Sequence, residues 1–296
     1  MRGLVTSSRS EIGKTLFDYG PGLTGAVAFA GADVLTKVAL GTGADVVTLA
    51  TARSLLGIAL IALWIAVGPT PIPLTTDERR TAYGMGVLYA GIIFFIFKAI
   101  ELLTVPMAIL VYFTYPMITG MVGAAMGIEK MSWRGLLAAA AAFGGLALMI
   151  GASPSELSVP GLLCIVVAIV CRVAVLVISR MRLMKADARL STWYSNLATA
   201  TLFGAGSLVT LHFAPPVVPI GWLWILLLGV TTTTGVAVLF ISTTRIGPFR
   251  TALTMNLEPL LATLLSAIFL GEVFAPVQAI GAAVMIASLF AFQLRR

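Results

Sequence analysis

Long apolar segments follow one another along almost the whole chain. Each is about 17–25 residues long, the length at which an α-helix crosses ~30 Å of hydrocarbon. Because backbone polar groups find no water at that depth, only helices or a closed β-barrel can span it, and these segments lack the period-2 alternation of a barrel wall. With 59% hydrophobic and 10% charged residues, the chain also differs from ordinary soluble domains. The sequence therefore predicts an all-α polytopic membrane protein.

The apolar segments number ten, and short connections containing glycine, proline and polar residues separate them. The first segment is long and has no clear cleavage site, so we interpret it as a retained span and not as a signal peptide. We predict ten transmembrane helices near residues 22–40, 45–67, 81–100, 104–126, 135–152, 159–179, 190–212, 221–241, 250–270 and 276–293.

The basic residues are distributed unequally when the ten spans are threaded with both termini on one side of the membrane. Of the 19 lysines and arginines, all but Lys37, Arg53, Lys98 and Arg172 fall on that side. Since basic loops remain in the cytoplasm, both termini are predicted to be cytoplasmic. The net charge of +7 is then explained by topology and lipid headgroups. The lipid bilayer is the expected partner, and nucleic acid is not.

The two halves of the chain match when the sequence is shifted by 143 residues. The shift aligns predicted spans without a gap and places Pro116 on Pro259. Because each half holds five helices, an odd number, the second half must enter the membrane from the opposite side. Inverted repeats are typical of secondary transporters, whose substrate site lies near the midplane. We therefore expect two inverted five-helix repeats, residues 1–155 and 156–296.

The closing segment NLEPLLATLLSAIFLGEVFAPVQAIGAAVMIASLF resembles the last hairpin of the EamA-type drug/metabolite transporter superfamily. The first half carries partner features: DVLTK at 33–37, TLATARSLL at 48–56, and the segment from Tyr115-Pro116 to Glu129. Within the superfamily, the chain is most similar to YddG-type exporters of aromatic amino acids. The resemblance implies a basket-shaped bundle in a bacterial inner membrane, in which helices 1, 3, 4, 6, 8 and 9 surround a central cavity.

Several charges lie inside the predicted spans, where an unpaired charge is costly. Arg172 and Glu258 each lie eight residues from a basic residue at an inner helix end, a depth of about 12 Å. Asp33 and Arg53 match each other in depth in the outer half, and Lys37 follows Asp33 by one helical turn. Two interpretations remain open: neutralising pairs that lock helices together, or a charged lining for a zwitterionic substrate. We predict direct or water-bridged contact between Arg172 and Glu258.

Two prolines interrupt the fourth and ninth predicted spans. Pro116 and Pro259 each remove one helix hydrogen bond, which frees the carbonyls of Tyr112 and Met255. Each proline either kinks its helix or forms a hinge with a carbonyl that faces substrate. The first half has Tyr115 before its proline where the second half has glutamate, so a role for a carboxylate there is absent.

Aromatic and polar side chains deep in the spans are the candidate substrate contacts. Positions 112 and 115 share one helical face, and adding 143 gives 255 and 258 on the equivalent helix. Inverted symmetry would bring these faces together at the midplane. An apolar substrate side chain would then contact the rings and leave the zwitterion to the polar groups. The predicted lining is Tyr89, Phe97, Tyr112, Tyr115, Asn256 and Glu258.

Enzyme chemistry is not expected. His212 is the single histidine, and no zinc-ligand set, nucleophile with a histidine base or nucleotide-binding loop occurs. Cys164 and Cys171 lie seven residues apart on one helix, too far for a disulfide in a straight helix. We therefore predict no catalytic residues, no metal and no cofactor.

The sequence favours a secondary transporter that exports small amphipathic metabolites, amino acids including aromatic ones, by alternating access. The alternatives are drug or metabolite efflux by proton antiport and, more remotely, an intramembrane enzyme or a scaffold subunit. The fifth and tenth predicted helices are rich in glycine and alanine, so they could form a dimer contact or pack within the bundle. The oligomeric state stays open.

Overall fold

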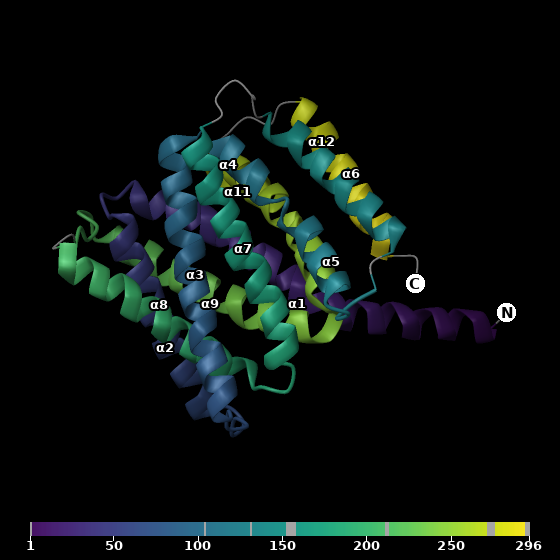
Figure 1. The fold of residues 1–296 in the computed structure, drawn as a ribbon, viewed down its shortest axis with the longest axis horizontal. Helices are drawn as coiled ribbons and strands as arrows, with labels where there is room; N and C mark the ends of the chain where they lie inside the picture. Colours follow the sequence, from purple (N-terminus) through teal and green to yellow (C-terminus); the bar gives the residue numbers. More distant parts are fainter. Residues whose placement is uncertain are drawn as a thin grey trace.

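The computed structural model describes residues 2–103, 105–130, 132–151, 158–210, 213–270 and 276–293, and every regular element in these ranges is an α-helix (Figure 1). The predicted repeat boundary at 155 and His212 lie outside them. The helices are α1 (Arg2–Leu40), α2 (Val46–Val67), α3 (Thr76–Leu102), α4 (Val105–Tyr112), α5 (Tyr115–Ala125), α6 (Trp133–Ile150), α7 (Val159–Arg182), α8 (Ala188–Thr210), α9 (Ile220–Ile246), α10 (Pro248–Met255), α11 (Leu257–Leu270) and α12 (Pro276–Gln293).

The prediction of an all-α membrane protein with several spans is confirmed. α6 and α12 contain shorter apolar stretches, and the apolar sequence of α8 is interrupted by polar side chains such as Ser195 and Asn196. Seven segments of the described residues are long and apolar enough to cross a membrane: Phe17–Leu40, Val46–Val67, Thr76–Ile100, Met107–Ala125, Val159–Arg182, Ile220–Ile246 and Pro248–Phe269.

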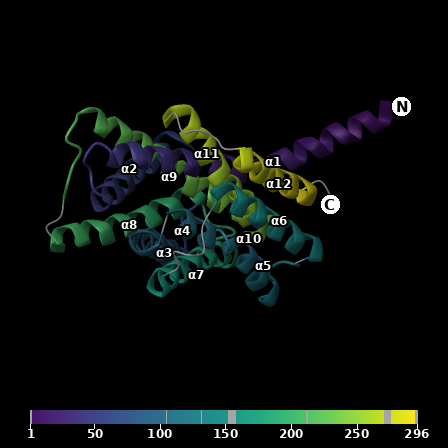
Figure 2. The same cartoon turned by 90° about the horizontal axis from the view of Figure 1, so that it is seen from above.

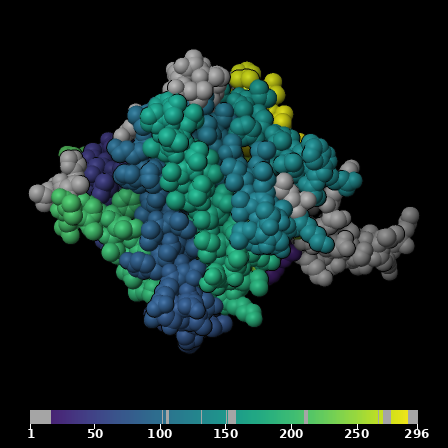
Figure 3. All heavy atoms as spheres, in the orientation of Figure 1, coloured from purple at the N-terminus to yellow at the C-terminus, as the bar shows by residue number. Residues whose placement is uncertain are grey.

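The side chains of α7 divide between an apolar outer face and a buried inner face. Val159, Leu163, Val166 and Val170 are exposed and recur at helical spacing. On the face of the molecule in Figure 3, α7 runs beside α3. The inner face is buried and carries Arg172. Lipid therefore meets aliphatic side chains, while the charge lies inside the bundle.

The fourth and ninth predicted spans are each divided into two helices. Phe113 and Thr114 separate α4 from α5, and Asn256 separates α10 from α11. Pro116 and Pro259 lie in the first turn of the second helix in each case. A proline is well tolerated there because the first N–H groups of a helix have no partner within the helix. The two prolines therefore begin new helices instead of bending continuous ones.

Helix bounds recur along the chain at the offset of 143 residues. Adding 143 to the bounds of α4 gives those of α10, and adding 143 to the bounds of α6 gives those of α12. The same shift carries α2 onto α8 and α3 onto α9 to within one residue at each end. The breaks in the fourth and ninth spans therefore occupy equivalent positions in the two halves of the chain.

The main helix contacts join the two halves. α1 packs along α9, α3 along α7, α2 along α8, and α6 along α12, which lie side by side in both views (Figures 1 and 2). A Cβ on Gly145 would lie 2.6 Å from the carbonyl oxygen of Gly281, and one on Gly281 would lie 2.5 Å from that of Gly145. The absence of a side chain at these two glycines thus allows the backbones of α6 and α12 to touch. The small-residue helices pack on each other within one chain.

The connections between helices gather at two ends of the bundle. One end, which we call the basic end, holds Arg180, Arg189 and Arg245 at or near the ends of α7, α8 and α9. At the opposite end, the connection after α1 meets the connection after α8. There the backbone N–H of Asp45 donates to the carbonyl of Ala214 at 3.1 Å.

Arg189 fixes the connection between α7 and α8 at the basic end. Its guanidinium donates to Asp187 Oδ1 at 3.1 Å and Oδ2 at 2.7 Å, and to the carbonyl of Pro69 at 2.8 Å. Its Cζ lies 5.9 Å from the ring centroid of Trp64. Burial alone would raise the pKa of Asp187, but the hydrogen bonds and charge of Arg189 outweigh it and hold this pKa below its ordinary value. The carboxylate therefore stabilises the fold as long as it is ionised.

Asp187→Asn is expected to lower the stability by about 0.5 kcal/mol at neutral pH, the scale of a partly exposed ion pair. Because the folded-state pKa lies below the unfolded-state pKa, the contribution is complete above about pH 4 and is lost as the pH falls through the folded-state value. Melting temperatures of detergent-purified protein should therefore converge with those of the native protein at acid pH. A difference between the two melting temperatures that persists at acid pH would contradict the prediction.

Candidate functional site

Arg172 is a charged side chain that is buried inside the bundle, with 5% of its surface exposed. Its Cζ lies 5.3 Å from the ring centroid of Tyr115 on α5 and 5.5 Å from that of Phe29 on α1. Within the described residues, Arg172 forms no ion pair of 4.0 Å or less. The cation is therefore held by the electron-rich faces of aromatic rings and not by a bonded carboxylate.

An aromatic cluster surrounds the break between α4 and α5. The ring centroid of Tyr112 lies 5.6 Å from that of Phe113 and 5.5 Å from that of Tyr115, and the last two rings are 5.8 Å apart. Tyr115 is fully buried, and its hydroxyl donates to the carbonyl of Ala252 on α10 at 3.4 Å. The broken helix thus presents rings toward Arg172 and toward the second half of the chain.

Three buried polar groups near this cluster lack hydrogen-bond partners among the described residues. They are the hydroxyl of Tyr89 on α3, the Nε–H of Arg172 and the Oδ1 of Asn256 between α10 and α11. Their side chains are 9%, 5% and 3% exposed. An unmet buried polar group costs about 1–3 kcal/mol, and such groups usually have partners. This arrangement is typical of a site that receives polar groups from another molecule.

Four of the five charges predicted inside the spans interact electrostatically with one another. Asp33 interacts with Arg53 and with Glu258, and Glu258 also interacts with Arg172. The depths of these residues in the predicted spans had indicated two separate pairs, Asp33 with Arg53 and Arg172 with Glu258. Within the described part of the chain, none of these interactions is an ion pair of 4.0 Å or less. The side chain of Asp33 is exposed on α1.

The structure also places Phe97 and Lys37, and it adds one participant that was not predicted. Phe97 is half-buried on α3 and takes no part in the ring contacts described above, and Lys37 is exposed near the end of α1. Phe29 was not predicted, although it contacts Arg172. It precedes Asp33 by four residues on α1 and therefore shares a helical face with that carboxylate, which was the available signal.

A second polar contact joins the two halves at the basic end. Glu129, after α5, accepts the backbone N–H of Phe249 at 2.8 Å, in the first turn of α10. Gly247 precedes this helix with φ of +87°, and a Cβ there would lie 1.5 Å from Glu129 Oε1. Burial raises the pKa of Glu129 despite this bond and the charges of Arg250 and Arg180. Arg180 also donates to the carbonyl of Thr244 on α9.

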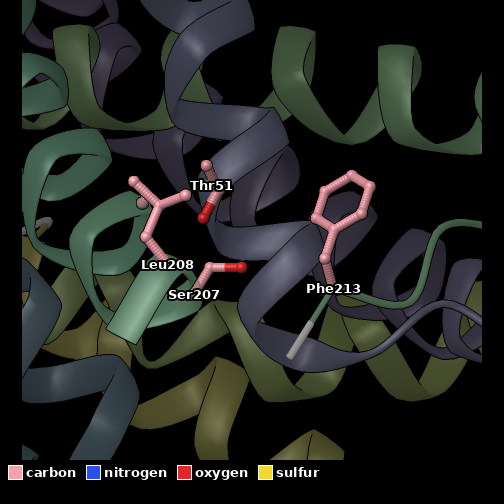
Figure 4. A pocket seen from close by; sticks show the side chains of 5 residues that line it. Thr51, Ser207, Leu208 and Phe213 are labelled. Carbon is pink, nitrogen blue, oxygen red and sulfur yellow. The ribbon is translucent and has the colours of Figure 1, made fainter. Parts of the chain in front are cut away.

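A separate pocket of about 380 Å³ lies between α2 and α8 at the end opposite the basic end (Figure 4). Thr51, Gly204, Ser207, Leu208 and Phe213 line it. The lining is mostly apolar and includes none of the buried charges. This pocket is therefore distinct from the site around Arg172.

The described fold and site define a polytopic helical membrane protein with charged and aromatic side chains gathered inside its bundle. The sequence model of the EamA-like transporter family matches residues 21–151 and again 159–293. The chain belongs to this family and is therefore a membrane transporter of small molecules. The resemblance to the EamA-type superfamily is confirmed.

Similarity to solved structures supports the same fold. One crystal structure of a protein matches with a TM-score of 0.79 and 22% sequence identity, covering 94% of this chain and 99% of the other. At this identity, the match shows a shared fold. No curated protein matches the sequence.

Proposed function

We propose that the protein is a secondary transporter that exports small amphipathic metabolites, in particular amino acids including aromatic ones. The observation that carries the proposal is the combination of a buried arginine, unpartnered polar groups and stacked rings inside a helical bundle. Rings suit an apolar side chain, while the polar groups suit a zwitterion. Such a site binds a small molecule that is polar at one end and apolar at the other.

The proposed architecture has ten spans in two inverted five-helix repeats within a bacterial inner membrane, with both termini in the cytoplasm. The repeated helix bounds and the two family matches support the repeats. The arginines at the basic end support a cytoplasmic position for that end. The equivalent breaks in α4–α5 and α10–α11 support a substrate site near the midplane, because transporters bind substrate where helices are interrupted.

The proposed mechanism is alternating access. Near the basic end, α5 packs against α10. The equivalent pair under the 143-residue offset is α4 and α11, which make no comparable contact among the described residues. A carrier in which one of two equivalent contacts is formed is closed at one end. This asymmetry supports a conformation that opens away from the basic end, and exchange of the two contacts would move the opening to the other side.

The proposal is tested by reconstitution into liposomes. Uptake of labelled phenylalanine and serine is measured, and Tyr112→Ala is expected to lower phenylalanine transport about tenfold and serine transport much less, because the Tyr112 ring would contact only the larger side chain. Tyr83→Ala, a partly exposed tyrosine near the start of α3, is the control and should leave both rates unchanged. Equal losses in a folded Tyr112→Ala protein would show that the ring does not contact substrate.

Efflux of drugs or metabolites by proton antiport is the second candidate. The packing of α1 against α11 favours it, because it brings the carboxylates of Asp33 and Glu258 into electrostatic range, and two such groups could bind and release a proton during transport. Transport that responds to an imposed pH gradient would support coupling. Transport at the same rate with and without the gradient would identify a facilitator.

A further inference from the structure

The guanidinium of Arg172 has hydrogen-bonding capacity that the protein does not use. The rings of Phe29 and Tyr115 lie against it. A ring against the face of a guanidinium leaves the N–H edge to donate, and the Tyr115 hydroxyl accepts from only part of that edge. Its Nε–H is buried and has no acceptor among the described residues. Because the rings hold the group in place, little further ordering is needed when an acceptor arrives.

A second free donor lies on the neighbouring helix. Tyr89 belongs to α3, which packs along α7, the helix that carries Arg172. The Tyr89 hydroxyl is buried, has no hydrogen-bond partner among the described residues and interacts electrostatically with Arg172. Two donors on adjacent helices suit an anion with two oxygens. A carboxylate matches the planar donor edge of arginine, and charge-assisted hydrogen bonds to it are strong.

Acceptors are found on the second broken helix. Asn256 Oδ1 is buried and unpartnered within the described residues, and Glu258 follows two residues later. Glu258 interacts with Arg172 through space, but the two form no ion pair of 4.0 Å or less. The carboxylate of Glu258 therefore balances the charge of Arg172 without occupying its donors. Arg172 and Tyr89 can therefore donate to the carboxylate of a zwitterion, while Asn256 and Glu258 can accept from its ammonium group.

We infer that Arg172 and Tyr89 bind the carboxylate of the transported substrate, so that the site selects carboxylates such as α-amino acids over amines and amides of the same shape. The ammonium group of an amino acid then faces Asn256 and Glu258. This inference rests on the proposed function and adds to it the chemical group that the substrate must carry. A site that hydrogen-bonds a substrate group discriminates strongly against analogues without that group, because its own polar atoms are left unpaired.

The experiment uses three probes with the same phenyl group. Phenylalanine carries both charges, 3-phenylpropionate carries only the carboxylate, and phenylalaninamide carries only the ammonium group. Each is measured by its shift of the melting temperature of detergent-purified protein and by competition with labelled phenylalanine in liposomes. The native protein is expected to bind both carboxylates at concentrations about tenfold or more below those needed for phenylalaninamide.

Two variants remove the proposed donors, a third keeps a positive charge at position 172, and a fourth serves as control. Tyr89→Phe loses a single oxygen and keeps the ring, so it should fold and bind both carboxylates several-fold more weakly. Arg172→Met keeps much of the volume and should lose the preference for carboxylates, whereas Arg172→Lys should restore part of it. Arg182→Met removes an exposed arginine at the end of α7 and should retain the native preference.

The outcomes separate this inference from the proposed function. Equal binding of phenylalanine and phenylalaninamide by the native protein overturns the inference, as does an unchanged preference in both Tyr89→Phe and Arg172→Met. The proposed function stands in those cases if phenylalanine is transported. Selective binding of carboxylates without any flux would instead overturn the proposed function and leave the binding site intact. If none of the probes binds or moves, both are wrong.

Discussion

Gly86→Ala is expected to destabilise the protein by about 3 kcal/mol, at the upper end of typical overpacking effects. Gly86 lies where α3 crosses α8, and a Cβ there would be 2.1 Å from the carbonyl oxygen of Ser195 and 2.6 Å from the Cβ of Ala198. The first of these is a backbone atom, so the helices must separate. Separation also strains the hydrogen bond from Thr199 Oγ1 to the carbonyl of Gly86, now 3.0 Å.

The matched control is Gly84→Ala, two residues earlier on the same helix. A Cβ at this position would meet no other atom within 4 Å. Since alanine favours a helix over glycine by about 1 kcal/mol, this variant should be as stable as the native protein or more so. Thermal unfolding in detergent measures both. Similar melting temperatures for the two variants would mean that α3 and α8 do not approach as closely as described.

Gly247→Ala is expected to cost about 2–3 kcal/mol and to remove the bond between Glu129 and the start of α10. The combination of φ +87° and ψ +166° is essentially restricted to glycine and strains any residue with a Cβ by about 1–2 kcal/mol. The added Cβ would also lie 1.5 Å from Glu129 Oε1 and 2.7 Å from its Cδ, so the carboxylate must leave. The lost hydrogen bond to the N–H of Phe249 adds about 1 kcal/mol, the usual value of a helix cap.

A double-mutant cycle tests the cause of this effect. Glu129→Ala alone loses the cap, whereas Glu129→Ala combined with Gly247→Ala loses the cap once and avoids the clash. The double variant should therefore be no less stable than Gly247→Ala, and the two single effects should fail to add by about 1 kcal/mol or more. Denaturant unfolding of all four proteins gives the coupling. Simple additivity would show that Glu129 and Gly247 act independently.

The sequence predicted an all-α protein with several membrane spans because long apolar segments leave few alternatives. It did not predict that the fourth and ninth spans are divided, since Pro116 and Pro259 are compatible with both a kink and a new helix. The helix ends at Tyr112 and Met255 are the residues whose carbonyls the prolines free. The sequence therefore indicated where each span is interrupted, but it did not indicate that a new helix begins there.

The charged site was harder to predict because counting residues along a helix gives depth only. Depth matched Asp33 with Arg53 and Arg172 with Glu258, but the rotation of each helix decides which side chains meet. α1 packs against α11, and this brings Asp33 into range of Glu258. The contact between Glu129 and Phe249 joins residues 120 positions apart, so no local pattern could reveal it.

The backbone contact between α6 and α12 has a mechanical consequence. Neither helix can slide past the other by one turn, because the side chain of Met149 or Met285, which shares the face of Gly145 or Gly281, would then enter a space that only a glycine hydrogen fits. The pair therefore behaves as one stiff body that takes one helix from each half of the chain. Because α6 follows α5 in the first half and α12 follows α11 in the second, this body is attached to a divided span in each half of the chain.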